Sequence, residues 1–165
     1  PYGEMAPSSA TVSGGLFYLA LYAVTSFGIW AIVTMMEKAE NSGLELEKFA
    51  GLGNTHPLVA VCMLIFLLSF IGIPPLLGFW GKLTLFRTAL EGGYLSLAVI
   101  GILTSLLSAY YYLKIVYFMF MRGGSPDLHQ DKWALVIMAG AAALIVLLGL
   151  MPGIAASLVK IPPLL

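Results

Sequence analysis

One lysine, Lys82, follows directly after a segment, residues 57–81, that carries no charged side chain. A charged lysine at the centre of a bilayer costs about 2.5–3.5 kcal/mol or more, so an ionisable residue inside a membrane is by default a functional candidate. Desolvation disfavours the charged form, which would let this normally fixed charge release and rebind a proton. Lys82 is therefore the main candidate for a proton-carrying residue.

Two other titratable residues are weaker candidates for the same chemistry. Lys114 lies near the end of an apolar segment among tyrosines, and its stem can run along a helix to the membrane interface. His56 precedes Pro57 at the start of an apolar segment, where a capping or headgroup-level histidine is more common than a proton relay. His129 and the single cysteine, Cys62, have no second ligand at metal-binding spacing. The sequence therefore predicts no metal site, no cofactor site and no catalytic residue.

The composition is typical of an integral membrane protein. Of the 165 residues, 60% are hydrophobic and only 10% are charged, whereas a soluble domain has about 25% charged residues. The net charge is zero, so no basic surface is available for nucleic acid. We therefore expect a protein of the lipid bilayer that does not bind nucleic acid.

The chain forms one membrane domain over residues 1–165, with polar loops at 37–56 and 122–132. About 20 apolar residues suffice for a helix to cross about 30 Å of hydrocarbon. A short amphipathic turn is expected within the first loop, at residues 44–49. The predicted fold class is all-α, a polytopic membrane helix bundle. Its four transmembrane segments lie at about residues 14–36, 57–90, 92–121 and 133–159.

The second segment is too long for one simple crossing. Residues 57–90 would measure about 51 Å as a straight helix at 1.5 Å per residue, which typical tilts near 20° do not absorb. Pro74 and Pro75 lack amide hydrogens, and Gly72 and Gly78 loosen the chain on either side. We therefore expect this helix to be discontinuous, with its break between these glycines.

Such a break frees carbonyls, here at about residues 70–73, that cannot stay unpaired in hydrocarbon. It survives only where it is buried in protein or lines a wet cavity, and broken helices are typical of ion and substrate sites. Half-helices at about 57–71 and 78–90 would place Lys82 near mid-membrane. The alternative is that residues 57–81 already span the bilayer and Lys82 marks their charged boundary. The spacing of the residues leaves both open.

Basic residues in the short loops predict the orientation. The loops at 37–56 and 122–132 contain Lys38, Lys48, Arg122 and Lys132, whereas the opposite side has only Arg87 and Lys160. Basic loops stay on the cytoplasmic side. The C-terminus would then face outward, which in a bacterial inner membrane is the periplasm.

The break also carries a family resemblance. Residues 72–75, Gly-Ile-Pro-Pro, with residues 78–82, Gly-Phe-Trp-Gly-Lys, closely resemble the broken twelfth transmembrane helix of the antiporter-like subunits of respiratory complex I and of related sodium/proton antiporter complexes. The flanks agree, at 18–23 (Tyr-Leu-Ala-Leu-Tyr-Ala) and 108–114 (Ser-Ala-Tyr-Tyr-Tyr-Leu-Lys). They are most similar to the subunit N branch, with the sister subunits as the alternative. The chain would be the last four of fourteen spans of a longer polypeptide.

The resemblance implies proton translocation coupled to quinone reduction elsewhere in NADH-quinone oxidoreductase, by a subunit without a redox centre or cofactor of its own. NADH, FMN, iron–sulfur clusters and quinone would belong to partner subunits. Lys82 would be the terminal ionisable residue of the proton channel. The implied partners are other membrane subunits of complex I, the upstream part of the same polypeptide and the lipid bilayer. A structural or assembly subunit without conduction, and a sodium/proton antiporter subunit, are the alternatives.

Overall fold

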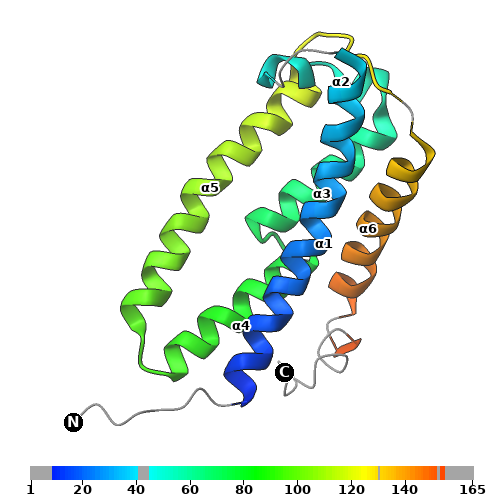
Figure 1. Ribbon diagram of the computed structural model, residues 1–165. Coiled ribbons are helices and arrows are strands. Elements are labelled where there is room, and N and C mark those ends of the chain that lie inside the picture. The colour runs from blue at the N-terminus through cyan, green and yellow to red at the C-terminus, as the bar shows by residue number, and fades with distance from the viewer. Residues whose placement is uncertain (1–8, 41–44, 130, 152, 155–165) are drawn as a thin grey trace.

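The computed structural model describes residues 9–40, 45–129, 131–151 and 153–154, which form helices and loops without strands (Figure 1). The helices are α1 (Ser9–Glu40), η1 (Leu46–Phe49), α2 (Leu52–Thr55), α3 (Pro57–Ile71), α4 (Leu77–Glu91), α5 (Leu95–Met121) and α6 (Lys132–Leu150). By length and composition, α1, α5 and α6 can each cross a membrane, and α3 is a shorter apolar helix. The predicted all-α membrane bundle is confirmed at this level.

Three predicted segment ends differ from the helix ends in the structure. The first helix begins at Ser9 rather than at residue 14, because its small uncharged residues are compatible with a first helical turn. It continues past residue 36, and the Lys38 amine near its end pairs with Asp131 at 3.3 Å. The third segment becomes helical only at Leu95, because Gly93 turns the chain after α4 with φ +78°.

The last predicted segment, 133–159, extends past the end of its helix, α6. Helix α6 ends at Leu150, because the proline of Met151-Pro152-Gly153 cannot continue a helix. Residues 155–165, with Lys160, lie outside the described part of the chain. The expected turn at 44–49 is present as η1, with residue 44 outside the described residues.

Helix α1 packs along both α3 and α4 through glycines. A Cβ atom on Gly28 would lie 2.2 Å from the ring of Phe66 on α3, and one on Gly14 would lie 3.2 Å from Thr84 on α4. Phe66 is fully buried, in a core that also contains Ile32 and Met138. The absence of side chains at the two glycines therefore lets α1 contact both neighbours closely.

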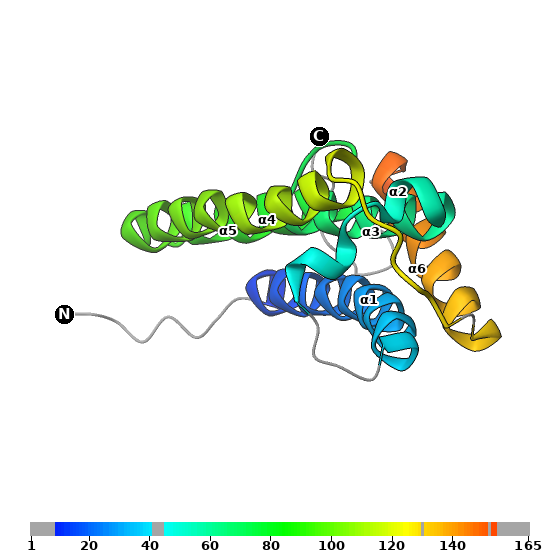
Figure 2. The same cartoon turned by 90° about the horizontal axis from the view of Figure 1, so that it is seen from above.

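The two basic loops meet at one end of the bundle, as the orientation argument requires (Figure 1). The amide of Gly51 donates to the Phe118 carbonyl at 3.3 Å, and that of His129 donates to Met35 at 3.0 Å. Gly51 has φ +77°, and a Cβ there would lie 2.1 Å from the carbonyl oxygen of Gly124. Seen from above, α4 and α5 extend together to one side of the other helices (Figure 2).

Candidate functional site

Helix α3 ends at Ile71 and helix α4 begins at Leu77, the bounds expected for the two half-helices to within one residue. Gly72 takes φ +89°, which L side chains rarely adopt, and its amide and that of Ile73 donate to Leu68 at 3.0 and 3.1 Å. The Pro74–Pro75 peptide bond is cis. The chain between the two helices is therefore an ordered turn.

This turn is held from both sides. The amide of Gly78 donates to the Ser69 hydroxyl at 3.2 Å, and a Cβ on Gly78 would lie 2.0 Å from the Ser69 carbonyl oxygen. On α6, the Gly149 carbonyl accepts from the Trp80 indole at 3.0 Å, and a Cβ on Gly149 would lie 2.4 Å from the Pro75 oxygen. Only glycine fits at these two contacts.

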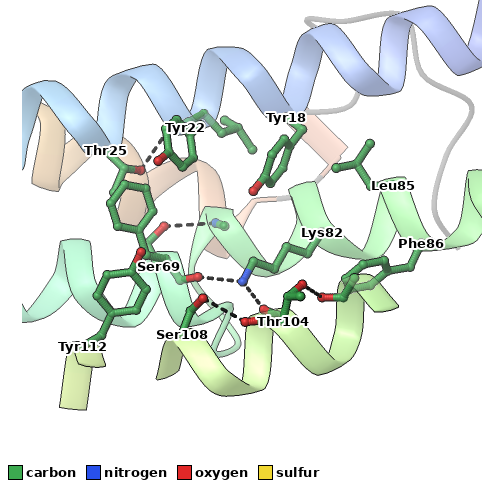
Figure 3. Close-up of a pocket in the computed structure, with 15 residues that line it drawn as sticks. Tyr18, Tyr22, Thr25, Ser69, Lys82, Leu85, Phe86, Thr104, Ser108 and Tyr112 are labelled. Atoms are coloured by element: carbon green, nitrogen blue, oxygen red, sulfur yellow. Dashed lines mark hydrogen bonds between the residues drawn. The ribbon is translucent and has the colours of Figure 1, made fainter. Parts of the chain in front are cut away.

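Lys82 reaches back from α4 to the end of α3 (Figure 3). Its ammonium donates to the carbonyls of Phe70 at 2.7 Å and Ile71 at 3.1 Å. In a continuous helix these two carbonyls would accept from the amides four residues on. Those residues are Pro74 and Pro75, which have no amide hydrogen. Lys82 therefore supplies the donors that the prolines remove, at a helix end that also favours a cation.

The third partner of the Lys82 ammonium is the Ser105 hydroxyl on α5. Lys82 itself is partly buried, and it lines a cavity of about 400 Å³ between α1, α3, α4 and α5. At about 30 Å³ per water, this volume suits a cluster of about ten molecules. The cavity is rich in hydroxyl groups, from Tyr18, Tyr22, Thr25, Ser69, Thr104, Ser105, Ser108 and Tyr112 (Figure 3).

A second cavity, of about 290 Å³, is lined by the end of α3, by α4 and by α5. Its lining is apolar, as with Ile71, Phe79 and Leu106, apart from Lys82 and Ser105. Lys82 and Ser105 line both cavities. The two side chains therefore stand between a hydroxyl-rich space and an apolar one.

The weaker candidates lie elsewhere. His56 is the N-cap residue of α3, and its Nδ1 lies 3.1 Å from the Thr55 hydroxyl, at the end with the basic loops. Lys114 is exposed on α5 and lines neither cavity. Within the described residues, no group of three histidine, cysteine or acidic side chains could hold a metal ion. The structure thus unites Lys82 with the break and leaves the other two candidates apart.

Ser105, the partner of Lys82 on α5, was not identified from the sequence, although the spacing of polar residues on α5 indicates a shared face. Gly101, Ser105, Ser108 and Tyr112 recur at intervals of three or four and so share one helix face. Tyr112 lines the hydroxyl-rich cavity from the same face. Its ring packs 5.6 Å from that of Phe70, which fixes its position beside the break.

Tyr18 and Tyr22 line this cavity from α1. Their spacing of four residues places them on one face of α1, with Tyr18 beside Gly81 of α4 and Tyr22 beside Phe70 of α3. The ring of Tyr22 lies 5.0 Å from that of Phe70. Aromatic hydroxyls from two helices therefore surround the space next to Lys82.

Known proteins are similar to this chain in sequence and fold. A family model described as NADH:quinone oxidoreductase/Mrp antiporter, TM, matches residues 3–108. NADH-quinone oxidoreductase subunit N of Bdellovibrio bacteriovorus is 39% identical over 143 residues, covering 86% of this chain and 29% of that protein. The same subunit of Trichlorobacter lovleyi is 38% identical over 160 residues, covering 95% of this chain and 32% of that protein.

Among solved structures, a chain of respiratory complex I from Thermus thermophilus superposes with a TM-score of 0.76 at 32% identity. The match covers 86% of this chain and 33% of that one. The chain therefore spans about a third of the length of the relatives it matches.

Proposed function

The chain belongs to the NADH:quinone oxidoreductase/Mrp antiporter transmembrane family, and we propose that it is part of a proton-translocating membrane subunit of NADH-quinone oxidoreductase. The named relatives, which are subunits N of that enzyme, support this assignment. In this proposal the chain has no redox centre. NADH, FMN, iron–sulfur clusters and quinone would act in partner subunits, and Lys82 would carry the proton here.

The observation that carries the proposal is the set of partners around Lys82. A lysine ammonium has three N–H donors, and three acceptors meet it, from Phe70, Ile71 and Ser105. This arrangement lets a charge exist where hydrocarbon alone would not tolerate it. The adjoining hydroxyl-lined cavity has room for the water that would bring or remove a proton.

We infer further that α3 and α4 together form one interrupted crossing, beside the crossings made by α1, α5 and α6. The basic loop end would be cytoplasmic and the α4–α5 turn would face outward. In the described residues of the α4–α5 end, Arg87 is the basic residue, and it pairs with Glu91 at 2.7 Å. The C-terminus would then be periplasmic. The exposed apolar faces would meet lipid, other membrane subunits or the preceding part of the same polypeptide.

The test is the replacement Lys82→Met in the full-length subunit, assembled in its complex in membrane vesicles. Proton uptake driven by NADH is followed with a pH-sensitive dye, and assembly is followed on native gels. We expect uptake to fall by about 10²-fold, the lower range for losing a positioned proton-transfer group. The complex should still assemble.

The matched control is Lys114→Met, which removes a lysine from α5 away from the cavities. It should pump at close to the wild-type rate. Normal pumping by an assembled Lys82→Met complex would instead favour a structural or assembly role. Uptake that requires sodium would point to the antiporter alternative.

A further inference from the structure

Ser105 differs from the other hydroxyl residues around Lys82. It lines both cavities and bonds the Lys82 ammonium. Thr104 and Ser108 line only the hydroxyl-rich cavity, and their hydroxyls donate to carbonyls of their own helix at 2.8–3.0 Å. Thr25 does the same on α1, at 2.9 Å from Leu21. Among the described residues, Ser105 is thus the hydroxyl that joins Lys82 to both spaces.

The three partners of Lys82 also differ in what they can do when the proton leaves. An ammonium offers three donors, whereas the neutral amine keeps two N–H groups and gains a lone pair. The carbonyls of Phe70 and Ile71 can only accept, so they suit the two remaining N–H groups. A hydroxyl can accept or donate. Ser105 can therefore remain bonded to Lys82 in both of its protonation states.

We propose that Ser105 relays the proton of Lys82 to and from water in the adjoining cavities, an inference that rests on the proposed function of Lys82. In the release step, the Nζ–H bond breaks and a new Oγ–H bond forms as Ser105 takes this proton. The original Oγ–H bond breaks and its proton passes to a cavity water, which becomes hydronium. Lys82 is left neutral, and the new hydroxyl hydrogen donates to its lone pair. Uptake of a proton is the reverse.

No competing acid lines these cavities in the described residues. The other titratable groups there are Tyr18 and Tyr22 on α1 and Tyr112 on α5, and none is bonded to Lys82. Neither α3 nor α4 contributes a carboxylate to either lining. The relay therefore uses the single hydroxyl that the lysine contacts.

The experiment compares Ser105→Ala, Ser105→Thr and Thr34→Ala in the full-length subunit within its complex. Proton uptake is divided by the amount of assembled complex on native gels, so that a loss of assembly is not counted as a loss of transfer. We expect Ser105→Ala to lower this ratio about tenfold, the effect of one lost hydrogen bond to a charged group. Ser105→Thr keeps the hydroxyl, and the cavities on either side have room for its methyl group. It should restore most of the rate. Thr34→Ala removes a hydroxyl of α1 that lines neither cavity and donates to its own helix at 2.8 Å, so it should leave the rate unchanged.

Each outcome separates this inference from the function it rests on. Wild-type uptake by Ser105→Ala, with Lys82→Met inactive, overturns the relay and leaves the proposed function intact. Equal losses in Ser105→Ala and Ser105→Thr assign Ser105 a packing role and also overturn the relay. Wild-type uptake by an assembled Lys82→Met complex overturns both.

Discussion

Lys82 and Lys114 lie within helices, away from the helix ends, and their surroundings are opposite. Lys82 is held by two backbone carbonyls and a hydroxyl at the junction of α3 and α4. Lys114 lies on the uninterrupted helix α5 and is exposed, and its ammonium makes no hydrogen bond to another described residue. The difference lies in the backbone, because α5 contains no proline and its interior carbonyls have amides four residues on.

This comparison shows how a helix can make a site for a cation without any acidic side chain. Two prolines remove the amides that Phe70 and Ile71 would otherwise bind, and the bare carbonyls become ligands for an ammonium. Glycines then let the next helix approach closely enough to deliver the lysine. The first three of the following changes should weaken this difference between the two lysines, and the fourth concerns the loop end; they stand in order of decreasing effect.

The largest effect is expected for Gly78→Ala. The added Cβ would lie 2.0 Å from the Ser69 carbonyl oxygen, a backbone atom that cannot move aside cheaply. We expect a loss of about 3 kcal/mol in stability, the upper range for overpacking, measured as a lower melting temperature of the purified complex. Gly15→Ala is the control, because nothing lies within 4 Å of its Cβ position. Equal melting of the two variants would contradict a close contact at the break.

The next effect is expected for Ser69→Ala. The Ser69 side chain is 2% exposed and accepts from the Gly78 amide, which would lose its partner. Leaving a buried donor unsatisfied costs about 2 kcal/mol. Ser108→Ala, on the continuous helix, removes a hydroxyl that only donates to its own helix, and it should cost much less. Urea or thermal unfolding of the two variants side by side measures the difference in stability. Similar losses of stability would contradict a stabilising role for the hydrogen bond from the Gly78 amide to Ser69.

A smaller effect is expected for the double change Pro74→Ala with Pro75→Ala. The restored amides would compete with Lys82 for the Phe70 and Ile71 carbonyls and make the segment more like α5. Proton uptake should fall about tenfold, as for one lost hydrogen bond to a charge. Pro57→Ala is the control, since proline at the first helical position removes an amide that needs no helical partner. Unchanged uptake in the double variant would contradict the role of the missing amides.

The smallest effect concerns the loop end, away from both lysines. The Trp133 amide, at 3.0 Å, and then the Lys38 ammonium hold the pKa of Asp131 below its ordinary value of 3.8. Because the folded pKa is the lower one, the stabilisation is fully present above 3.8 and is lost as the pH falls through the folded value.

Asp131→Asn should therefore lower the melting temperature slightly at neutral pH, and the difference should disappear in acid. The amide can still cap α6, so only the charge is removed. Added salt should reduce the difference at neutral pH, because this ion pair is exposed to solvent. A difference that grew on acidification would contradict the direction of the shift.

Much of this arrangement could be predicted from local chemistry. The position of the turn follows from paired prolines between glycines, and the end of α6 follows from the proline after Met151. The start of α1 could not be predicted, because serine and small residues are compatible with either a loop or a first helical turn. The contact between Ser105 and Lys82 could not be predicted from the sequence, because the two side chains meet only when α5 packs back against α4.

Helix α1 sets the spacing between α3 and α4. Its Gly28 fixes α3 through Phe66, and its Gly14 fixes α4 through Thr84. Inserting one residue between these glycines would turn one contact away by about 100°. The distance between Lys82 and the carbonyls it binds therefore depends on a third helix. Helix α1 can be substituted on its outer face, but its length between Gly14 and Gly28 cannot change.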